Sequence, residues 1–238
     1  SDLHLDPLFS PFCDSSSRCR NASALGFSCK QPAFGNALFG RFGCDAPPLL
    51  VSSAVADMRA RNPSPSFVIV SGDFASHALA DGNATFHAMQ AATSALMQQF
   101  PNTPVVPVIG NNDLPKDYCI PPNAAAWYAK LQQLWQPWLS RSGDITSTAT
   151  FLQGGYSVSR PLAGLVVVAL NTVYYSASFS SNCSAAAAGQ RAARGVKQQQ
   201  EQDDVAQQQL NWLADVLQNA CDANDRVIEV IPWRVGFR

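Results

Sequence analysis

The amino-acid sequence predicts an α/β protein, because short apolar runs alternate with longer segments of helical spacing. The runs at 67–70 and 104–109 are rich in β-branched residues and too short for helices, which indicates buried strands. Polar residues follow each run at once: Asp73 comes after the first, and Asn111 and Asn112 come after the second. Open α/β sheets place their chemistry just beyond the carboxyl ends of their strands.

The composition fits a single globular domain over residues 1–238. Hydrophobic residues make up 47% of the chain, which is enough for a substantial core. No apolar run approaches the roughly 20 residues that span a bilayer. The formal net charge of -1 does not indicate a nucleic-acid-binding surface. The chain opens on Asp2-Leu3-His4, so we expect the strand before Asp2 to lie upstream of this sequence.

The cysteines favour an oxidising compartment. There are seven, and four lie in a loop-like segment rich in Ser, Pro, Gly and Phe: Cys13, Cys19, Cys29 and Cys44. Their spacing fits paired zinc ligands poorly, so we expect disulfides, with at least one thiol left over. Sequons at Asn21, Asn83 and Asn182 agree with a secreted protein or one of the lysosomal or vacuolar lumen.

The first predicted helix follows Asp45, which can cap it, and runs to about Arg61 with Pro47 and Pro48 in its first turn. Its expected apolar stripe is Leu50, Ala54 and Met58. A proline-rich turn then leads into the strand at 67–70.

A second helix is expected over 83–100, and His87 beside its apolar stripe is interpreted as a surface histidine. The stripe consists of Phe86, Met89, Thr93, Leu96 and Phe100. A third helix is expected over 124–139, with side chains that indicate core rather than a ligand platform. These are Trp127, Leu131, Leu134, Trp135 and Trp138.

The last third of the sequence continues the alternation of strands and helices. Two strands are expected at 156–159 and 165–171, and a final strand at 226–231. The stretch 176–202 is biased in Ser, Ala and Gln and is interpreted as a solvated loop. A helix over 203–220 would place three leucines on one face: Leu210, Leu213 and Leu217.

Four polar residues at the expected strand ends form a candidate metal site. An imidazole, two carboxylates and an amide oxygen, from His4, Asp2, Asp73 and Asn111, suit Zn, Fe or Mn better than Ca. One carboxylate can bridge two cations, and such a pair supplies hydroxide near neutral pH. Each motif alone is weak, since Asp2 could cap a helix and the residues after Gly110 could be turn residues. Their order favours the metal site: DxH, then GDxxxH, then GNxD.

These motifs give the chain its resemblance to the calcineurin-like metallophosphoesterases, and within them to the acid sphingomyelinase-like branch. The matching stretches are 1–4, 40–47, 71–73 with His77, 110–113, 170–172 and 209–213. The resemblance implies a four-layer α-β-β-α sandwich and two divalent metal ions, with zinc expected first and iron or manganese as alternatives. It assigns Asp2 and His4 to the first metal, Asp73 to both metals and Asn111 to the second, and places His77 near the substrate phosphate.

The sequence departs from this family in two places. Asn112 stands where the family has a histidine, and an amide can donate a hydrogen bond but cannot transfer a proton. Polyphosphatase-like members of the branch also look like GNND. The family further supplies three histidines after the strand at 226–231, whereas here only His4, His77 and His87 occur. The sequence therefore predicts an incomplete sandwich that lacks C-terminal strands, with an open sheet edge and a tendency to associate.

The resulting hypothesis is a metal-dependent phosphoric ester hydrolase resembling acid sphingomyelinase, with His77 and Asn112 as candidate catalytic residues. A phosphodiester lipid is the expected substrate and polyphosphate the alternative. Contact with a membrane surface is expected to be peripheral. A truncated, non-catalytic binding protein is the rival from another class. A nucleotide-binding domain is disfavoured, because the sequence has neither GxGxxG nor a P-loop.

Overall fold

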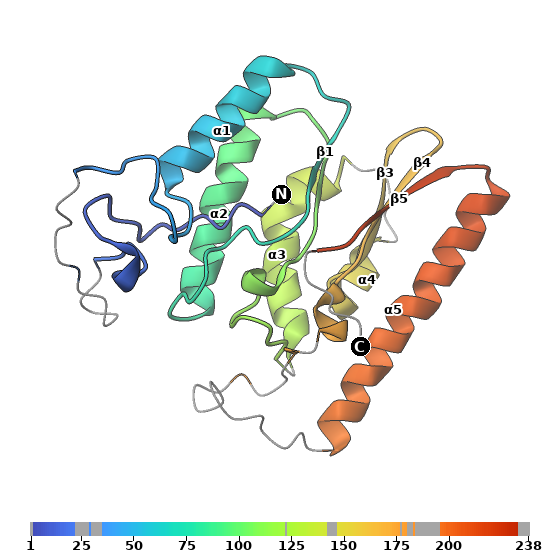
Figure 1. The fold of residues 1–238 in the computed structure, drawn as a ribbon. Helices are drawn as coiled ribbons and strands as arrows, with labels where there is room; N and C mark the ends of the chain where they lie inside the picture. The colour runs from blue at the N-terminus through green and yellow to red at the C-terminus, as the bar shows by residue number, and fades with distance from the viewer. Residues whose placement is uncertain are drawn as a thin grey trace.

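The strands form two small sheets (Figure 1). A computed structural model describes residues 2–21, 29, 35–121, 123–141, 147–176, 178–179, 183 and 196–232. In the first sheet, β1 (Val68–Val70) pairs in parallel with β2 (Val105–Pro107). In the second, β4 (Leu165–Ala169) pairs antiparallel with β3 (Ser157–Leu162) and parallel with β5 (Arg226–Val230).

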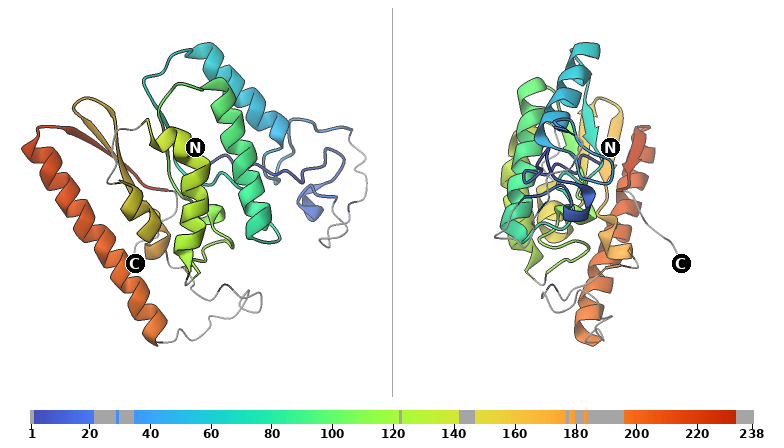
Figure 2. Two further views of the ribbon diagram at one scale, coloured as in Figure 1. Left: turned by 180° about the vertical axis from the view of Figure 1, so that it is seen from behind. Right: turned by 60° about the vertical axis from the view of Figure 1, so that its left-hand side comes forward.

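Helices cover the outer faces of both sheets (Figures 1 and 2). α1 (Pro48–Arg61), α2 (Gly82–Gln99) and α3 (Ala124–Leu139) lie on the side of the first sheet. α4 (Ser147–Gly154) packs beside α3, and the long α5 (Val196–Asp222) lies across the second sheet. One-turn 3₁₀ helices occur at Ser15–Ser17, Asn111–Asp113 and Thr172–Tyr175.

The apolar side chains of β4 show how the layers are stacked. Val167 and Ala169 pack in one buried cluster with Val106 of β2 and with Val108, which follows β2. Alternate residues on β4, including Val166, belong to a different cluster beneath α5. This period-two division is that of a strand buried on both faces. A third cluster joins the first sheet to its helices. The predicted α-β-β-α order of layers is confirmed.

The prediction for α1 is right in extent and wrong in detail. Val51 and Val55 are the buried side chains, whereas Leu50 and Met58 are exposed. The helix carries apolar residues on two faces, so spacing alone could not tell which face packs. The residue at the N-cap is a proline and makes no side-chain hydrogen bond. Asp45 is therefore not the N-cap residue of α1, and its carboxylate contacts His77 instead.

Two further helical segments differ from expectation. The predicted loop over 176–202 is wrong at 196–202, because α5 already begins at Val196. Its first turns are rich in Gln and have no apolar stripe, so they resemble a solvated loop in sequence. α4 was not expected at all. α2, α3 and the five strands lie where the sequence predicts them, and His87 is exposed on α2 as expected.

Three disulfides confirm the interpretation of the cysteines. They are Cys13–Cys29, Cys19–Cys44 and Cys119–Cys183, and Cys221 is an exposed free thiol. The sequon residue Asn182 and residues 233–238 lie outside the described part of the chain.

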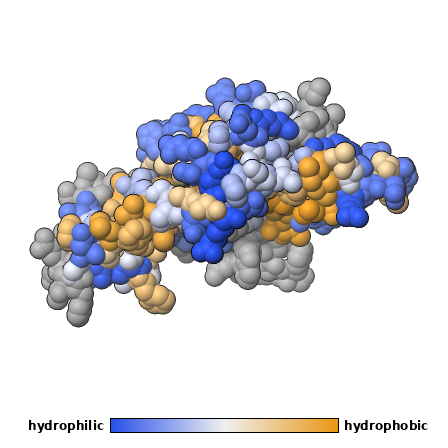
Figure 3. Space-filling model, turned by 90° about the horizontal axis from the view of Figure 1, so that it is seen from above, coloured by the Kyte–Doolittle hydropathy of each residue, from blue (hydrophilic) through white to orange (hydrophobic). Residues whose placement is uncertain are grey.

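Exposed large apolar side chains occur on α1, at Leu49, Leu50 and Met58, and in two further regions. Phe12, Phe39 and Phe42 belong to the disulfide-bearing segment, and Ile228 and Ile231 belong to β5 and the residue after it. Seen from above, apolar atoms gather toward the two ends of the molecule with a polar middle between them (Figure 3). Among the described helices, none has the length and hydropathy needed to cross a bilayer.

Candidate metal centre

The N-terminal Asp2-Leu3-His4 segment lies along the loop that follows β1. The amides of Leu3 and His4 both donate to the Asp73 carbonyl, at 3.0 and 2.8 Å. Leu5 then forms isolated parallel bridges to Ala75 and Ala46. These backbone contacts bring two motifs that are some 70 residues apart in sequence into one site.

The backbone at this site is tightly constrained. His4 and Asp73 have left-handed backbone conformations, with φ of 43° and 52°, which residues other than glycine rarely adopt. The loops after β1 and β2 are also in close contact. A Cβ on Gly72 would lie 2.7 Å from the Gly110 nitrogen, and one on Gly110 would lie 2.2 Å from Asp73 Oδ1. Glycine at both positions is what lets the two loops meet.

Three predicted ligands come together at this point. Asp2, His4 and Asp73 each offer one ligand atom, and these atoms lie within 4.8 Å of one another. His4 Nε2 and Asp73 Oδ2 are 3.6 Å apart, which is too long for a hydrogen bond. Burial raises the pKa of Asp73, and the Asn112 amide and His4 oppose that shift.

Asn111 and Asn112 begin the 3₁₀ helix after β2. The Asn112 backbone amide donates to Asp73 Oδ1 at 2.9 Å, which places this turn beside the cluster. Asn111 Nδ2 donates to Asp117 at 2.6 Å, so its Oδ1 is the atom that remains to serve as a ligand. Asn112 is only 5% exposed, yet both polar atoms of its side chain lack a well-formed hydrogen bond to the described residues.

Asp113 is a buried residue whose carboxylate links the loops of the site. Its carboxylate accepts hydrogen bonds from Gly110 N at 2.9 Å and Ala75 N at 3.1 Å, so it joins the loops after both strands. Complete burial, with the nearby charge of Asp73, raises the pKa of Asp113 to about 7. Sequence alone left open that it was an ordinary turn residue, whereas the structure makes it a buried structural acid.

His77 lies next to the cluster, stacked on His4 with ring centroids 4.4 Å apart. Its Nδ1 is 2.7 Å from Asp45 Oδ1, and its backbone amide donates to Asp45 Oδ2 at 3.0 Å. The hydrogen bond to Asp45 raises the pKa of His77. Burial alone would raise the pKa of Asp45, but His77 and His4 outweigh it and lower that pKa. Asp45 is the site residue that sequence reasoning missed, and its place in the matching stretch 40–47 was the available signal.

Comparisons with known proteins identify the family of this chain. The family model for calcineurin-like phosphoesterases matches residues 1–228. The chain belongs to the calcineurin-like phosphoesterase family. It is 31% identical to an acid sphingomyelinase-like phosphodiesterase 3b of Mus musculus over all of the chain and 47% of that relative. It is 31% identical to a cyclic GMP-AMP phosphodiesterase of Mus musculus over 74% of the chain and 38% of that relative. It is 36% identical to a sphingomyelinase phosphodiesterase D of Dictyostelium discoideum over 59% of the chain and 31% of that relative.

The chain thus spans less than half the length of these phosphoesterase relatives. The family is one of phosphoester hydrolases, and calcineurin-like phosphoesterases use divalent metals.

The donor set fits a divalent cation. Two carboxylates and an imidazole suit a first-row transition metal. His4 Nδ1 is buried without a hydrogen-bond partner among the described residues, as an atom reserved for another ligand would be. His4 also lies within 4.8 Å of Asp45 and His77, but those two side chains already satisfy each other. The group of Asp2, His4 and Asp73 is therefore the better candidate metal site of this chain.

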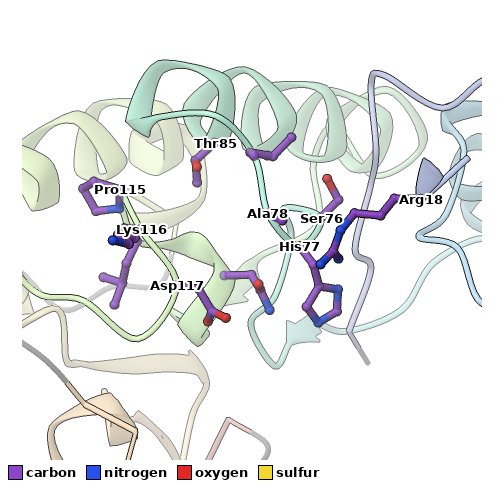
Figure 4. A pocket seen from close by; sticks show the side chains of 11 residues that line it. Arg18, Ser76, His77, Ala78, Thr85, Pro115, Lys116 and Asp117 are labelled. Carbon is purple, nitrogen blue, oxygen red and sulfur yellow. The ribbon is translucent and has the colours of Figure 1, made fainter. Parts of the chain in front are cut away.

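A cavity of about 270 Å³ opens beside the candidate metal centre. Figure 4 shows Arg18 and His77 on one side of it and Lys116 and Asp117 on the other. Asn112 also lines the cavity. Its walls bring together two cations, an imidazole, a buried amide and the carboxylate of Asp117, and the cations and the imidazole suit an anionic group.

Proposed function

We propose that this chain is a metal-dependent phosphodiester hydrolase. The observation that carries the proposal is the convergence of Asp2, His4 and Asp73 beside His77, on the fold of a phosphoesterase family. Asp2, His4 and Asp73 would hold one divalent cation, and Asp73 with Asn111 would contribute to a second. Zinc is the proposed metal, with iron or manganese as alternatives. When bound, such cations lower the pKa of a water molecule and neutralise phosphoryl oxygens.

The chain's own residues have separate tasks in this proposal. His77, whose protonated form is favoured by Asp45, binds a phosphoryl oxygen of the substrate. Asn112 donates a hydrogen bond from its unsatisfied Nδ2 to the phosphoryl or leaving oxygen. Because an amide cannot give up a proton at neutral pH, Asn112 cannot supply the proton that the leaving group needs.

The proposed substrate is a phosphodiester lipid. Two relatives have names that describe sphingomyelinase or sphingomyelinase-like enzymes. The exposed Phe12, Phe39 and Phe42 suit contact with a membrane surface from the aqueous side. Polyphosphate is the alternative, supported by Arg18 and Lys116 at the cavity. The three disulfides support a secreted or lumenal protein.

A second candidate function is the binding of a phosphate group without turnover. Asn112 favours it, since the position offers no proton donor for the leaving group. The second metal also has fewer ligands than the first, because only Asp73 and Asn111 are assigned to it.

Metal content by mass spectrometry, measured together with hydrolysis of bis-p-nitrophenyl phosphate, tests the proposal. We expect bound zinc and turnover, and a loss of both in Asp73→Ala. Asp57→Ala is the matched control, because Asp57 is an exposed carboxylate of α1 that pairs with Arg61. Bound phosphate without turnover would favour the binding protein, and a chain that takes up no metal would refute the hydrolase. Parallel assays with sphingomyelin vesicles and polyphosphate decide the substrate class.

A further inference from the structure

Arg20 is a buried cation that holds the loop carrying His77. Its side chain is fully buried, and its Nε lies 2.7 Å from Asp6 Oδ2. The other end of the guanidinium donates to the His77 carbonyl at 2.7 Å, the Ala78 carbonyl at 2.9 Å and the Ser76 hydroxyl at 3.1 Å. One planar side chain thus contacts three consecutive residues, with His77 in the middle.

Asp45 holds His77 from the other side. It accepts from the backbone amide and lies within hydrogen-bond distance of the imidazole Nδ1. Arg20 and Asp45 approach each other as well, with 3.8 Å between the guanidinium and Oδ2. His77 itself is in a turn and its side chain is 47% exposed, so packing alone does not fix the ring. The two charged neighbours therefore determine where the imidazole stands.

A disulfide links these two neighbours. Cys19 immediately precedes Arg20, Cys44 immediately precedes Asp45, and the two cysteines are bonded to each other. The residues that hold His77 are thus covalently tied to each other, although they come from distant parts of the disulfide-bearing segment. The Cys13–Cys29 disulfide lies in the same segment, but neither of its cysteines adjoins Arg20 or Asp45.

We propose that Arg20, Asp45 and the Cys19–Cys44 disulfide form a single positioning unit for His77, here called the His77 network. The inference rests on the proposed function only for its catalytic consequence. The imidazole must stand against His4 and face the cavity to meet a phosphoryl oxygen. Misplacement of such a group by about 1 Å can cost on the order of 100-fold in rate.

The first experiment replaces Arg20 with lysine. An ammonium keeps the charge opposite Asp6 but cannot reach Asp6 and both carbonyls at once. The sequence has three histidines, so ring resonances are readily assigned by NMR. We expect Arg20→Lys to weaken the nuclear Overhauser contact between the His4 and His77 rings and to lower kcat about 100-fold, with KM changed far less.

Arg41→Lys is the matched control. Arg41 lies in the same segment and donates to two carbonyls, those of Pro11 and Gly35, neither of which is near His77 in the chain. In Arg41→Lys, the contact between the His4 and His77 rings and the kcat should stay at wild-type values. Full kcat in Arg20→Lys, or an unchanged contact between the histidine rings, would show that Arg20 only balances charge.

The second experiment compares two disulfide deletions, Cys19→Ser with Cys44→Ser and Cys13→Ser with Cys29→Ser. The bonded cysteines are 25 and 16 residues apart, so the loss of unfolded-state constraint should be similar. Only the first deletion should displace the His77 ring and lower kcat. Equal effects of both deletions would overturn the proposal. If no variant hydrolyses phosphodiesters, the NMR contact still decides the positioning role, so the two proposals fail separately.

Discussion

The loops around the two sheets of this chain differ in backbone conformation and in the groups that they bring together. Around the first sheet, His4 and Asp73 have left-handed backbones, and a carboxylate at Asp113 is buried to join the loops. Around the second sheet, left-handed residues occur at turns, such as Gly164 between β3 and β4 and Asn224 before β5. The first sheet uses tight loops to bring polar groups together, whereas the second uses longer strands and a helix to bury apolar area. Strained backbone such as that of His4 and Asp73 beside the first sheet is typical of functional sites.

The largest expected effect in this comparison is that of Gly110→Ala. Its Cβ would lie 2.2 Å from Asp73 Oδ1 and 2.3 Å from Asp73 N, so the two loops cannot keep their contact. We expect a loss of about 3 kcal/mol or more in the free energy of unfolding, together with loss of metal binding. Urea denaturation and metal titration measure the two effects.

Gly164→Ala is the matched change at the second sheet. Gly164 has φ of +72°, but no atom lies within 4 Å of the added Cβ. The cost should be that of the backbone alone, about 1 kcal/mol, with metal binding unchanged. Equal losses in the two variants would mean that the close contact at the first sheet is not what makes its glycines necessary.

The next effect concerns the polar network of the second sheet. Gln209 of α5 is buried; it accepts from Asn171 N at 2.8 Å and donates to the Asn171 carbonyl at 3.1 Å. Gln209→Ala would leave both backbone groups buried and unpaired, which we expect to cost about 2 kcal/mol. Gln207→Ala, on an exposed side of the same helix, should cost less than about 0.5 kcal/mol. Thermal unfolding compares the two, and metal affinity should be unaffected in both.

Local periodicity decides which parts of the fold could be predicted from the sequence. The strands, α2 and α3 were predicted well because local periodicity decides them, and β4 is buried on both faces as its continuous apolar run indicates. The buried face of α1 was predicted wrongly because both of its faces carry apolar residues. The start of α5 was missed because its first turns have no apolar stripe to mark them.

The site could be predicted only where chain order carries information. Asp2, His4, Asp73 and Asn111 could be predicted as ligands because their motifs occur in the order DxH, GDxxxH and GNxD. The role of Asp45 depends on a partner 32 residues away, and that of Arg20 on partners up to 58 residues away. No local pattern marks such contacts, so the residues that position His77 became visible only in three dimensions.

The last prediction concerns Tyr128→Phe, whose effect on stability depends on pH. Burial, with the neighbouring Tyr174, raises the pKa of Tyr128 well above 10, and burial raises that of Tyr174 to about 12. In the unfolded chain both hydroxyls ionise near pH 10. Their contribution to stability is therefore complete below pH 10 and is lost as the pH rises from there toward the folded-state values.

Removing the Tyr128 hydroxyl should cost about 1 kcal/mol at pH 7, because Asn171 Nδ2 and the Tyr174 hydroxyl each lose a partner. Above pH 10 the variant should lose stability less steeply than the wild type, by up to about 1.4 kcal/mol per pH unit. Urea denaturation between pH 7 and 11 measures both values. Parallel curves for the two proteins would mean that the Tyr128 hydroxyl reaches water in the folded state. In that case α3 would be packed less tightly against the residues that follow β4 than the hydrogen bond to Asn171 implies, and the contrast between the two sheets would be weaker.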